Sequence, residues 1–255
     1  MTVNEGAMQV TVTGGSRGIG REIVRALAVD GFDVEFTYRE SADQATELLD
    51  ELRANWPVQD FGAHRLDLAD REQVDRFAEH LAETDTLFGL VHNAGQSCDA
   101  LAAMIDQDAA ERAMQVNFWS LTRLVTGAAR PMMQARAGRI IGIGSMAALH
   151  AMPGNSIYAA TKGAMLSYLR TVAVEFARKG ITANFIAPGY VDTDMMTAYA
   201  DRRADMERRI PVRRFGTPCE VAELARHLMS PAAKYITGSV LPIDGGVSAG
   251  MALHG

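Results

Sequence analysis

The stretch that decides the fold is residues 8–20, MQVTVTGGSRGIG, near the start of a chain of 255 residues. Its first half, Met8 to Thr13, is rich in β-branched residues and predicts a buried strand. Its second half is glycine-rich and leads into a helical pattern from about Ile19 to Val29. Glycines at such a turn let backbone N–H groups and a helix N-terminus approach a pyrophosphate closely. The stretch favours a nucleotide-binding βα unit, although the spacing is not the usual G-x-G-x-x-G and a plain strand-to-helix connection stays open.

The rest of the chain repeats this alternation of short apolar strands and longer helical segments. Near-continuous apolar strands separated by helices predict a parallel sheet with helices on both faces. No linker, repeat or shift of composition divides the chain, so we expect one doubly wound, Rossmann-type α/β domain over residues 1–255. The charged, irregular segment 191–214 predicts a mobile, lid-like insertion. Expected strands are 32–38, one ending near 64–66, 87–92, 139–144, 181–186 and 239–243; expected helices are 43–55, 73–82, 109–135 with interruptions at Gly127 and Pro131, 159–177 and 220–229.

Composition narrows the class of protein. The chain is 48% hydrophobic and 22% charged, with a formal net charge of −6. That charge gives no support to a general role on nucleic acid or on membrane surfaces. The two cysteines, Cys98 and Cys219, form no disulfide framework and no spaced metal site, so we expect no metal. The first residues lack the pattern of a signal peptide, and no apolar run reaches membrane-spanning length, so we expect a cytoplasmic protein.

The end of the second expected strand bears on the choice of cofactor. In dinucleotide sites this position carries an acid when a ribose 2′-hydroxyl is bound, whereas an arginine nearby accommodates a 2′-phosphate. The strand ends at Arg39, and Arg17 in the glycine turn could assist it, which favours NADPH. Glu40 lies next to Arg39, and an ordinary surface arginine is the alternative.

A candidate catalytic group lies in the second half of the chain. Tyr158 and Lys162 are four residues apart at the start of a predicted helix, a spacing that places phenol and ammonium on one face. A nearby cation favours phenolate and predicts a lowered tyrosine pKa, as general acid catalysis requires. Ser145 follows a strand, where ligands gather in open parallel sheets. Each residue also has a plain explanation: a solvated helix pair, a turn cap at Ser145, and a structural amide at Asn117.

Taken together and in order, these residues resemble the motifs of the short-chain dehydrogenase/reductase family. The resemblance covers essentially the whole chain, and the joint match is specific. His92 is a small departure, because many relatives have asparagine there. The motifs are Thr13-Gly14-x-x-x-Gly18-x-Gly20, Asn93-Ala94-Gly95, Asn117, Ser145, Tyr158-x-x-x-Lys162 and Pro188-Gly189.

The resemblance implies a role for each residue. Tyr158 donates a proton to the substrate oxygen, and Lys162 lowers the pKa of the phenol and holds the nicotinamide ribose. Ser145 hydrogen-bonds the carbonyl, and Asn117 keeps a water that connects Lys162 to solvent. With the arginines above, the expected cofactor contacts are Gly14, Ser16, Arg17, Gly18, Ile19, Gly20, Arg39, Asp67, Leu68, Asn93, Ala94, Gly95, Tyr158, Lys162, Pro188, Gly189, Val191 and Thr193.

Within the family, the chain is most similar to bacterial 3-oxoacyl-[acyl-carrier-protein] reductases. The similarity is found in residues 138–141, GRII, in residues 188–195, PGYVDTDM, and in the tail 235–246. An acidic carrier protein should dock on basic residues near the entrance of the site, and Arg136, Arg178 and Lys179 fall at matching positions. The alternative is that these are cations favoured by helix C-termini.

Other functions and assemblies stay open at this point. The chain could act on a steroid, a sugar or another small ketone, or could be a catalytically silent partner subunit. The residues do not distinguish fatty-acid synthesis from polyketide or polyene synthesis, nor do they reveal the acyl length. The resemblance implies a homo-oligomer, most commonly a tetramer, and a hetero-oligomer is compatible with the sequence.

Overall fold

Seven parallel strands form one sheet in the order β3-β2-β1-β4-β5-β6-β7 in the computed structural model, which describes residues 8–250 apart from the side chains of 195 and 198. The order reverses between β1 and β4, where ligands bind in doubly wound sheets. This confirms the predicted Rossmann-type fold class. The strands are β1 (Gln9–Thr13), β2 (Asp33–Tyr38), β3 (Phe61–Arg65), β4 (Leu87–His92), β5 (Gly138–Ile143), β6 (Ile181–Pro188) and β7 (Val240–Ile243).

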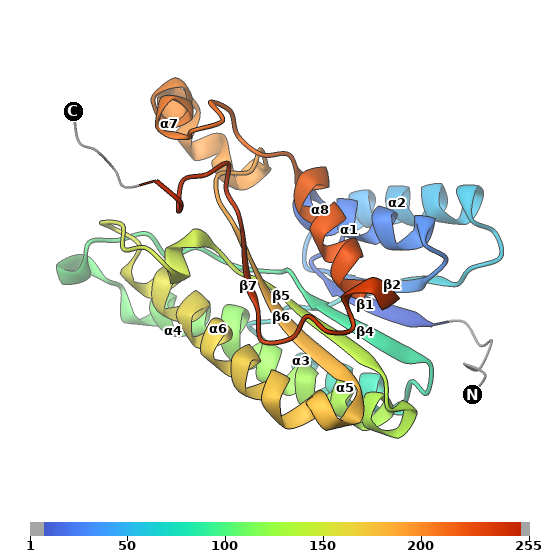
Figure 1. Cartoon of the computed structure of the whole chain (residues 1–255). Helices are drawn as coiled ribbons and strands as arrows, with labels where there is room; N and C mark the ends of the chain where they lie inside the picture. The colour runs from blue at the N-terminus through green and yellow to red at the C-terminus, as the bar shows by residue number, and fades with distance from the viewer. Residues whose placement is uncertain (1–7, 251–255) are drawn as a thin grey trace.

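Helices cover both faces of this sheet (Figure 1). One face carries α1 (Gly18–Val29), α2 (Ala42–Asn55) and α8 (Pro218–Met229), and the other carries α3 (Arg71–Glu83), α4 (Gln107–Met114), α5 (Ser120–Ala135) and α6 (Ser156–Phe176). Each layer buries its own apolar core against the sheet. Ile23 and Leu27 of α1 are fully buried on one side, and Leu121 and Leu124 of α5 on the other. Among residues 8–250, no helix is both long and apolar enough to span a bilayer.

The long helical pattern 109–135 is interrupted, but not where the sequence predicts. Gly127 and Pro131 both lie inside α5, and the break is a π-helical turn, Gln115–Trp119, between α4 and α5. At Gly127 a Cβ would lie 2.2 Å from the carbonyl oxygen of Ala78, so this glycine lets α5 pack closely on α3. The buried face of α5 outweighs the roughly 3 kcal/mol that an interior proline costs.

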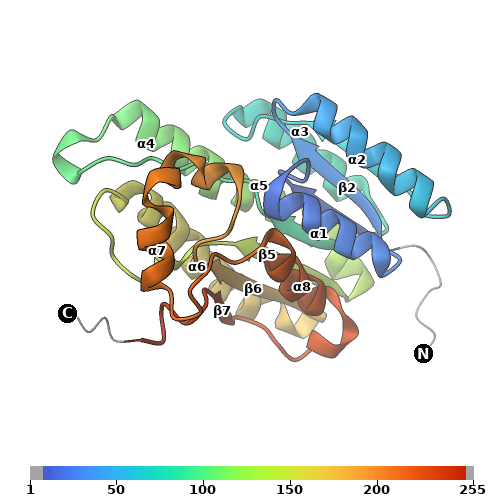
Figure 2. The same cartoon turned by 90° about the horizontal axis from the view of Figure 1, so that it is seen from above.

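The segment expected to be irregular, 191–214, is mostly helical. It contains a 3₁₀ helix, Asp194–Arg202, followed by α7 (Arg203–Arg209). α7 lies apart from the two helix layers in Figure 1, and in the view of Figure 2 it is seen in front of α6. Two exposed contacts connect the 3₁₀ helix to loops that follow β1 and β4. Arg17 pairs with Asp194 at 3.2 Å, and the Tyr199 hydroxyl donates to Asp99 at 3.0 Å. Exposed pairs of this kind contribute little stability, so mobility of the segment stays a prediction.

Candidate active site

A cleft of about 690 Å³ opens at the carboxyl ends of the strands, at the reversal of strand order. It brings together nearly every residue that the sequence singles out. Of the expected cofactor contacts, all but Gly20 line it, and of the expected catalytic residues all but Asn117 do. The lining residues that the sequence reasoning missed are Thr37, Tyr38, Glu40, Ser41, Leu66, Gln96, Arg112, Val116, Ile143, Gly144, Asp194 and Met196.

The glycine turn forms the floor of the cleft. Gly14 and Gly18 have φ values of +66° and +55°, which glycine adopts without strain. A Cβ at Gly20 would lie 2.1 Å from the carbonyl oxygen of Gly14, so only glycine lets α1 start this close to the turn. The Asn93 amide donates to the carbonyls of Thr13 and Gly14, both at 3.0 Å, and ties the turn to β4. The turn is therefore a rigid cradle at a helix N-terminus, which fits a dinucleotide pyrophosphate.

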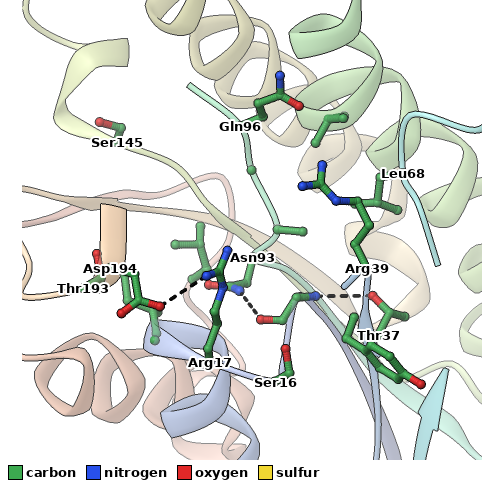
Figure 3. A pocket seen from close by; sticks show the side chains of 18 of the residues that line it. Ser16, Arg17, Thr37, Arg39, Leu68, Asn93, Gln96, Ser145, Thr193 and Asp194 are labelled. Carbon is green, nitrogen blue, oxygen red and sulfur yellow. Dashed lines mark hydrogen bonds and ion pairs between the residues drawn. The ribbon is translucent and has the colours of Figure 1, made fainter. Parts of the chain in front are cut away.

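The arginines in the cleft are each paired with an acid. Arg17 reaches Asp194 at 3.2 Å (Figure 3), and Arg39 lies 3.0 Å from its neighbour Glu40. Arg112, which the sequence reasoning did not select, lies 3.3 Å from Asp67. The side chains of Arg17 and Arg39 are exposed, so water screens these pairs and a phosphate could compete for the guanidinium groups.

Tyr158 and Lys162 lie on one face of α6, as their spacing predicts. The Lys162 ammonium is 5.7 Å from the centre of the Tyr158 ring and donates a 2.9 Å hydrogen bond to the carbonyl of Ile143. Lys162 is 2% exposed, so this carbonyl replaces much of the water that an ammonium normally binds. Ser145, directly beyond β5, accepts a hydrogen bond from Ala147 N at 3.1 Å and caps a short 3₁₀ turn at the edge of the cleft.

The pKa of Tyr158 differs from the expectation. Burial raises the pKa of the phenol to about 12, and the Ser145 hydroxyl opposes this rise without overcoming it. Lys162 does not contribute to the shift of the Tyr158 pKa, and burial lowers the pKa of the Lys162 ammonium to about 8. At neutral pH the phenol is therefore protonated, as a proton donor must be.

Asn117 lies behind the cleft in the π-helical turn. Its Oδ1 accepts a 2.8 Å hydrogen bond from Gln96 N, and its Nδ2 donates to Gln96 O and Thr161 Oγ1, both at 2.9 Å. Oδ1 retains one lone pair. A Cβ on Gly95 would be 3.3 Å from Lys162 Nζ and 3.4 Å from this oxygen. The absence of a side chain at Gly95 therefore leaves space between the Asn117 amide and the Lys162 ammonium. That arrangement is compatible with the expected bridging water.

The three cations proposed for docking lie far from the cleft of their own chain. Arg136 caps the C-terminus of α5, and Arg178 and Lys179 follow α6. Both helices run antiparallel to the strands, so their C-termini lie at the amino ends of β5 and β6, the opposite edge of the sheet. Arg136 donates to the carbonyl of Arg178 at 3.2 Å, which keeps the cations together. The expectation that they flank the entrance is therefore wrong within one chain.

Known proteins resemble this chain over nearly its whole length. A family model described as enoyl-(acyl carrier protein) reductase matches residues 14–248. The 3-oxoacyl-[acyl-carrier-protein] reductase MabA of Mycobacterium tuberculosis is 36% identical over 98% of both chains. The reductase of the same name, FabG, of Staphylococcus epidermidis is 34% identical over 92% of this chain and 97% of its own.

Solved structures agree with the sequence relatives. A structure described as an NAD(P)-dependent gluconate 5-dehydrogenase from Beutenbergia cavernae, with bound NADP, matches with a TM-score of 0.90 and 33% identity over 96% of this chain and 98% of that one. A blue fluorescent protein from a metagenomic library, in complex with NADPH, matches with a TM-score of 0.88 and 35% identity over 96% and 99%. The chain therefore belongs to the short-chain dehydrogenase/reductase family and is a short-chain oxidoreductase.

Proposed function

We propose that this protein uses NADPH to reduce a 3-oxoacyl thioester, carried on acyl carrier protein, to the 3-hydroxyacyl form. The observation that carries the proposal is the convergence of Tyr158, Lys162 and Ser145 at one end of a cleft whose other end is a glycine cradle. Curated relatives named 3-oxoacyl-[acyl-carrier-protein] reductase, at 34% and 36% identity, support the choice of substrate class.

NADPH supplies a hydride to the ketone carbon when it is bound. The Tyr158 hydroxyl donates its proton to the ketone oxygen, so the carbonyl gains one hydride and one proton and becomes a secondary alcohol. The Ser145 hydroxyl hydrogen-bonds the same oxygen and stabilises the charge that develops on it. Lys162 would hold the nicotinamide ribose, and Asn117 supports the path by which a proton returns to Tyr158.

The preference for NADPH rests on the arginines at the adenosine end of the cleft. Arg39, at the end of β2, and Arg17, in the glycine turn, both line the cleft. Within residues 8–250, the side chain of each pairs only with an exposed acid, which a 2′-phosphate could displace. Similar structures hold NADP and NADPH, which supports the same assignment.

Carrier docking on Arg136, Arg178 and Lys179 is proposed across subunits. Because these cations lie at the edge of the sheet opposite the cleft, a carrier bound there would deliver its acyl group to another copy of the chain. The proposed homo-oligomer, a tetramer, would supply that copy. Charge reversal at Arg136 and Lys179 should slow turnover of the carrier-bound substrate and spare a small free ketone, and equal losses on both substrates would contradict docking.

The test is the initial rate of reduction of a 3-oxoacyl-carrier protein and of its small thioester mimic, with NADPH and NADH side by side. We expect rapid oxidation of NADPH that Tyr158→Phe abolishes while NADPH binding persists. Turnover of a sugar ketone alone would favour a small-ketone reductase. Binding of NADPH with no turnover of any ketone would favour a silent partner subunit, and both results would overturn the proposal.

A further inference from the structure

Three metal-ligating side chains meet on the sheet face that α3 covers. Glu35 lies in the middle of β2, His64 lies in β3, and His80 lies near the end of α3. None of them lines the catalytic cleft. Nothing in their spacing along the chain predicts this meeting, because the residues are brought together from two strands and a helix.

The distances between ligand atoms suit a small cation. His80 Nε2 is 2.9 Å and His64 Nε2 is 3.5 Å from Glu35 Oε2, and one ligand atom from each of the three residues lies within 4.8 Å of the other two. Zinc ligands at about 2.0–2.2 Å in a tetrahedron lie roughly 3.3 Å from each other. Small rotations of the side chains would therefore close the set around a metal ion.

Local packing prepares this geometry. Glu35 is opposite Gly62 in the β2–β3 register. A Cβ at Gly62 would lie 3.3 Å from Glu35 Cγ and 3.4 Å from His64 Nε2, so the glycine leaves the space in which the side chains converge. The His64 ring also packs on Phe77 and His80, with ring centres 5.3 and 5.4 Å away.

One atom of the cluster lacks a partner. His64 Nε2 is buried and accepts or donates no hydrogen bond, although it lies 3.5 Å from a carboxylate oxygen. Buried polar atoms in native proteins are almost always satisfied. The unpartnered His64 Nε2 lies beside Glu35 Oε2, so a cation bound between these two atoms would satisfy the ring nitrogen.

We propose that Glu35, His64 and His80 form a Zn²⁺ site, with solvent completing the tetrahedron on the open side. Two imidazoles and one carboxylate are a donor set that zinc binds well. The side chains are 20–42% exposed, so an ion has a route in and water has a place to bind. Such an ion would join β2, β3 and α3. The site is independent of the proposed reductase activity and departs from the sequence-based expectation of no metal.

Isothermal titration of the untagged, metal-free full chain with ZnCl₂ tests the site. We expect saturable binding of one ion, lost in Glu35→Gln and in His80→Ala. His227→Ala is the matched control, because His227 is an exposed histidine on α8 and its loss should leave binding unchanged. At zinc concentrations about a hundredfold above Kd, the Tm of the wild type should rise by roughly 5 °C, and that of His80→Ala should not.

Titration with Co²⁺ gives a second readout, since its visible spectrum reports a tetrahedral nitrogen–oxygen ligand set. Thermal unfolding without metal and NADPH binding verify that each variant is folded; if Glu35→Gln fails to fold, the half-exposed His80→Ala decides alone. Absence of saturable binding by the wild type, or equal binding by His80→Ala, would overturn the proposal. Either result would assign the cluster to a carboxylate hydrogen-bonded to the His80 imidazole.

Discussion

Replacing Lys162 with methionine should stabilise the protein relative to the wild type as the pH falls, and should abolish turnover. Lys162 is buried, and burial lowers the pKa of its ammonium from 10.5 to about 8. Between these values the unfolded chain binds more protons than the folded one. The contribution of Lys162 to stability is therefore present above the unfolded pKa and is lost as the pH falls through the folded pKa.

The size of the effect follows from the two pKa values. Between pH 9.5 and pH 7, the free energy of unfolding of the wild type should fall by about 2 kcal/mol relative to Lys162→Met. The hydrogen bond to the carbonyl of Ile143 is lost in the variant at every pH, so it shifts the difference between the proteins without changing its slope. All other titrating groups are common to both proteins and cancel to first order.

Urea unfolding at pH 7.0, 8.25 and 9.5 measures this difference. Tyr158→Phe is the matched control, because burial holds the phenol pKa at about 12 and its removal should alter the pH dependence by only a few tenths of a kcal/mol in this range. Parallel pH profiles for wild type and Lys162→Met would refute the reasoning, since they would mean that the ammonium is not desolvated in the fold.

Further outcomes test the cradle, the buried amide and the cofactor choice. Gly20→Ala should weaken NADPH binding by roughly tenfold or more, because its Cβ clashes within the turn; fluorescence titration measures this, and Gly163→Ala, which meets nothing within 4 Å, should bind normally. Asn117→Ala should lower Tm by roughly 5 °C or more, since it leaves buried polar groups without partners at about 1–3 kcal/mol each; an unchanged melting curve would contradict this. Arg39→Ala should raise the Kd of NADPH about tenfold and leave that of NADH unchanged, and an equal change for both would remove Arg39 from phosphate recognition.

Local sequence determined most of the framework. The glycines of residues 13–20, the β-branched strands and the four-residue spacing of Tyr158 and Lys162 each act through nearest neighbours along the chain. Backbone conformation and the periods of strands and helices depend on such short-range interactions, so the doubly wound fold class and the position of the cleft were predictable, and the residues proposed as catalytic remain a prediction. The expected boundaries of most elements agree with the structure to within a few residues.

Only the tertiary structure determined the features that depend on contacts between residues distant in the sequence. Gly127 lies within α5 against the backbone of α3, and the π-helical turn falls instead around Asn117, whose amide binds Gln96 and Thr161. The high pKa of Tyr158 comes from desolvation, which a sequence does not display. Arg136 lies far from the cleft because α5 runs against the strands.

The meeting of Glu35, His64 and His80 has the same origin. Their side chains converge only because β2 and β3 pair in one register and α3 folds back over them. Burial, electrostatics and contacts across elements are set by the packing of the whole chain, whereas turns and periodicities are set by a few adjacent residues. For this protein, the packing of the whole chain determines protonation states, contacts between distant residues and the proposed metal site. Short-range patterns in the sequence determine the fold and the location of the reductase cleft.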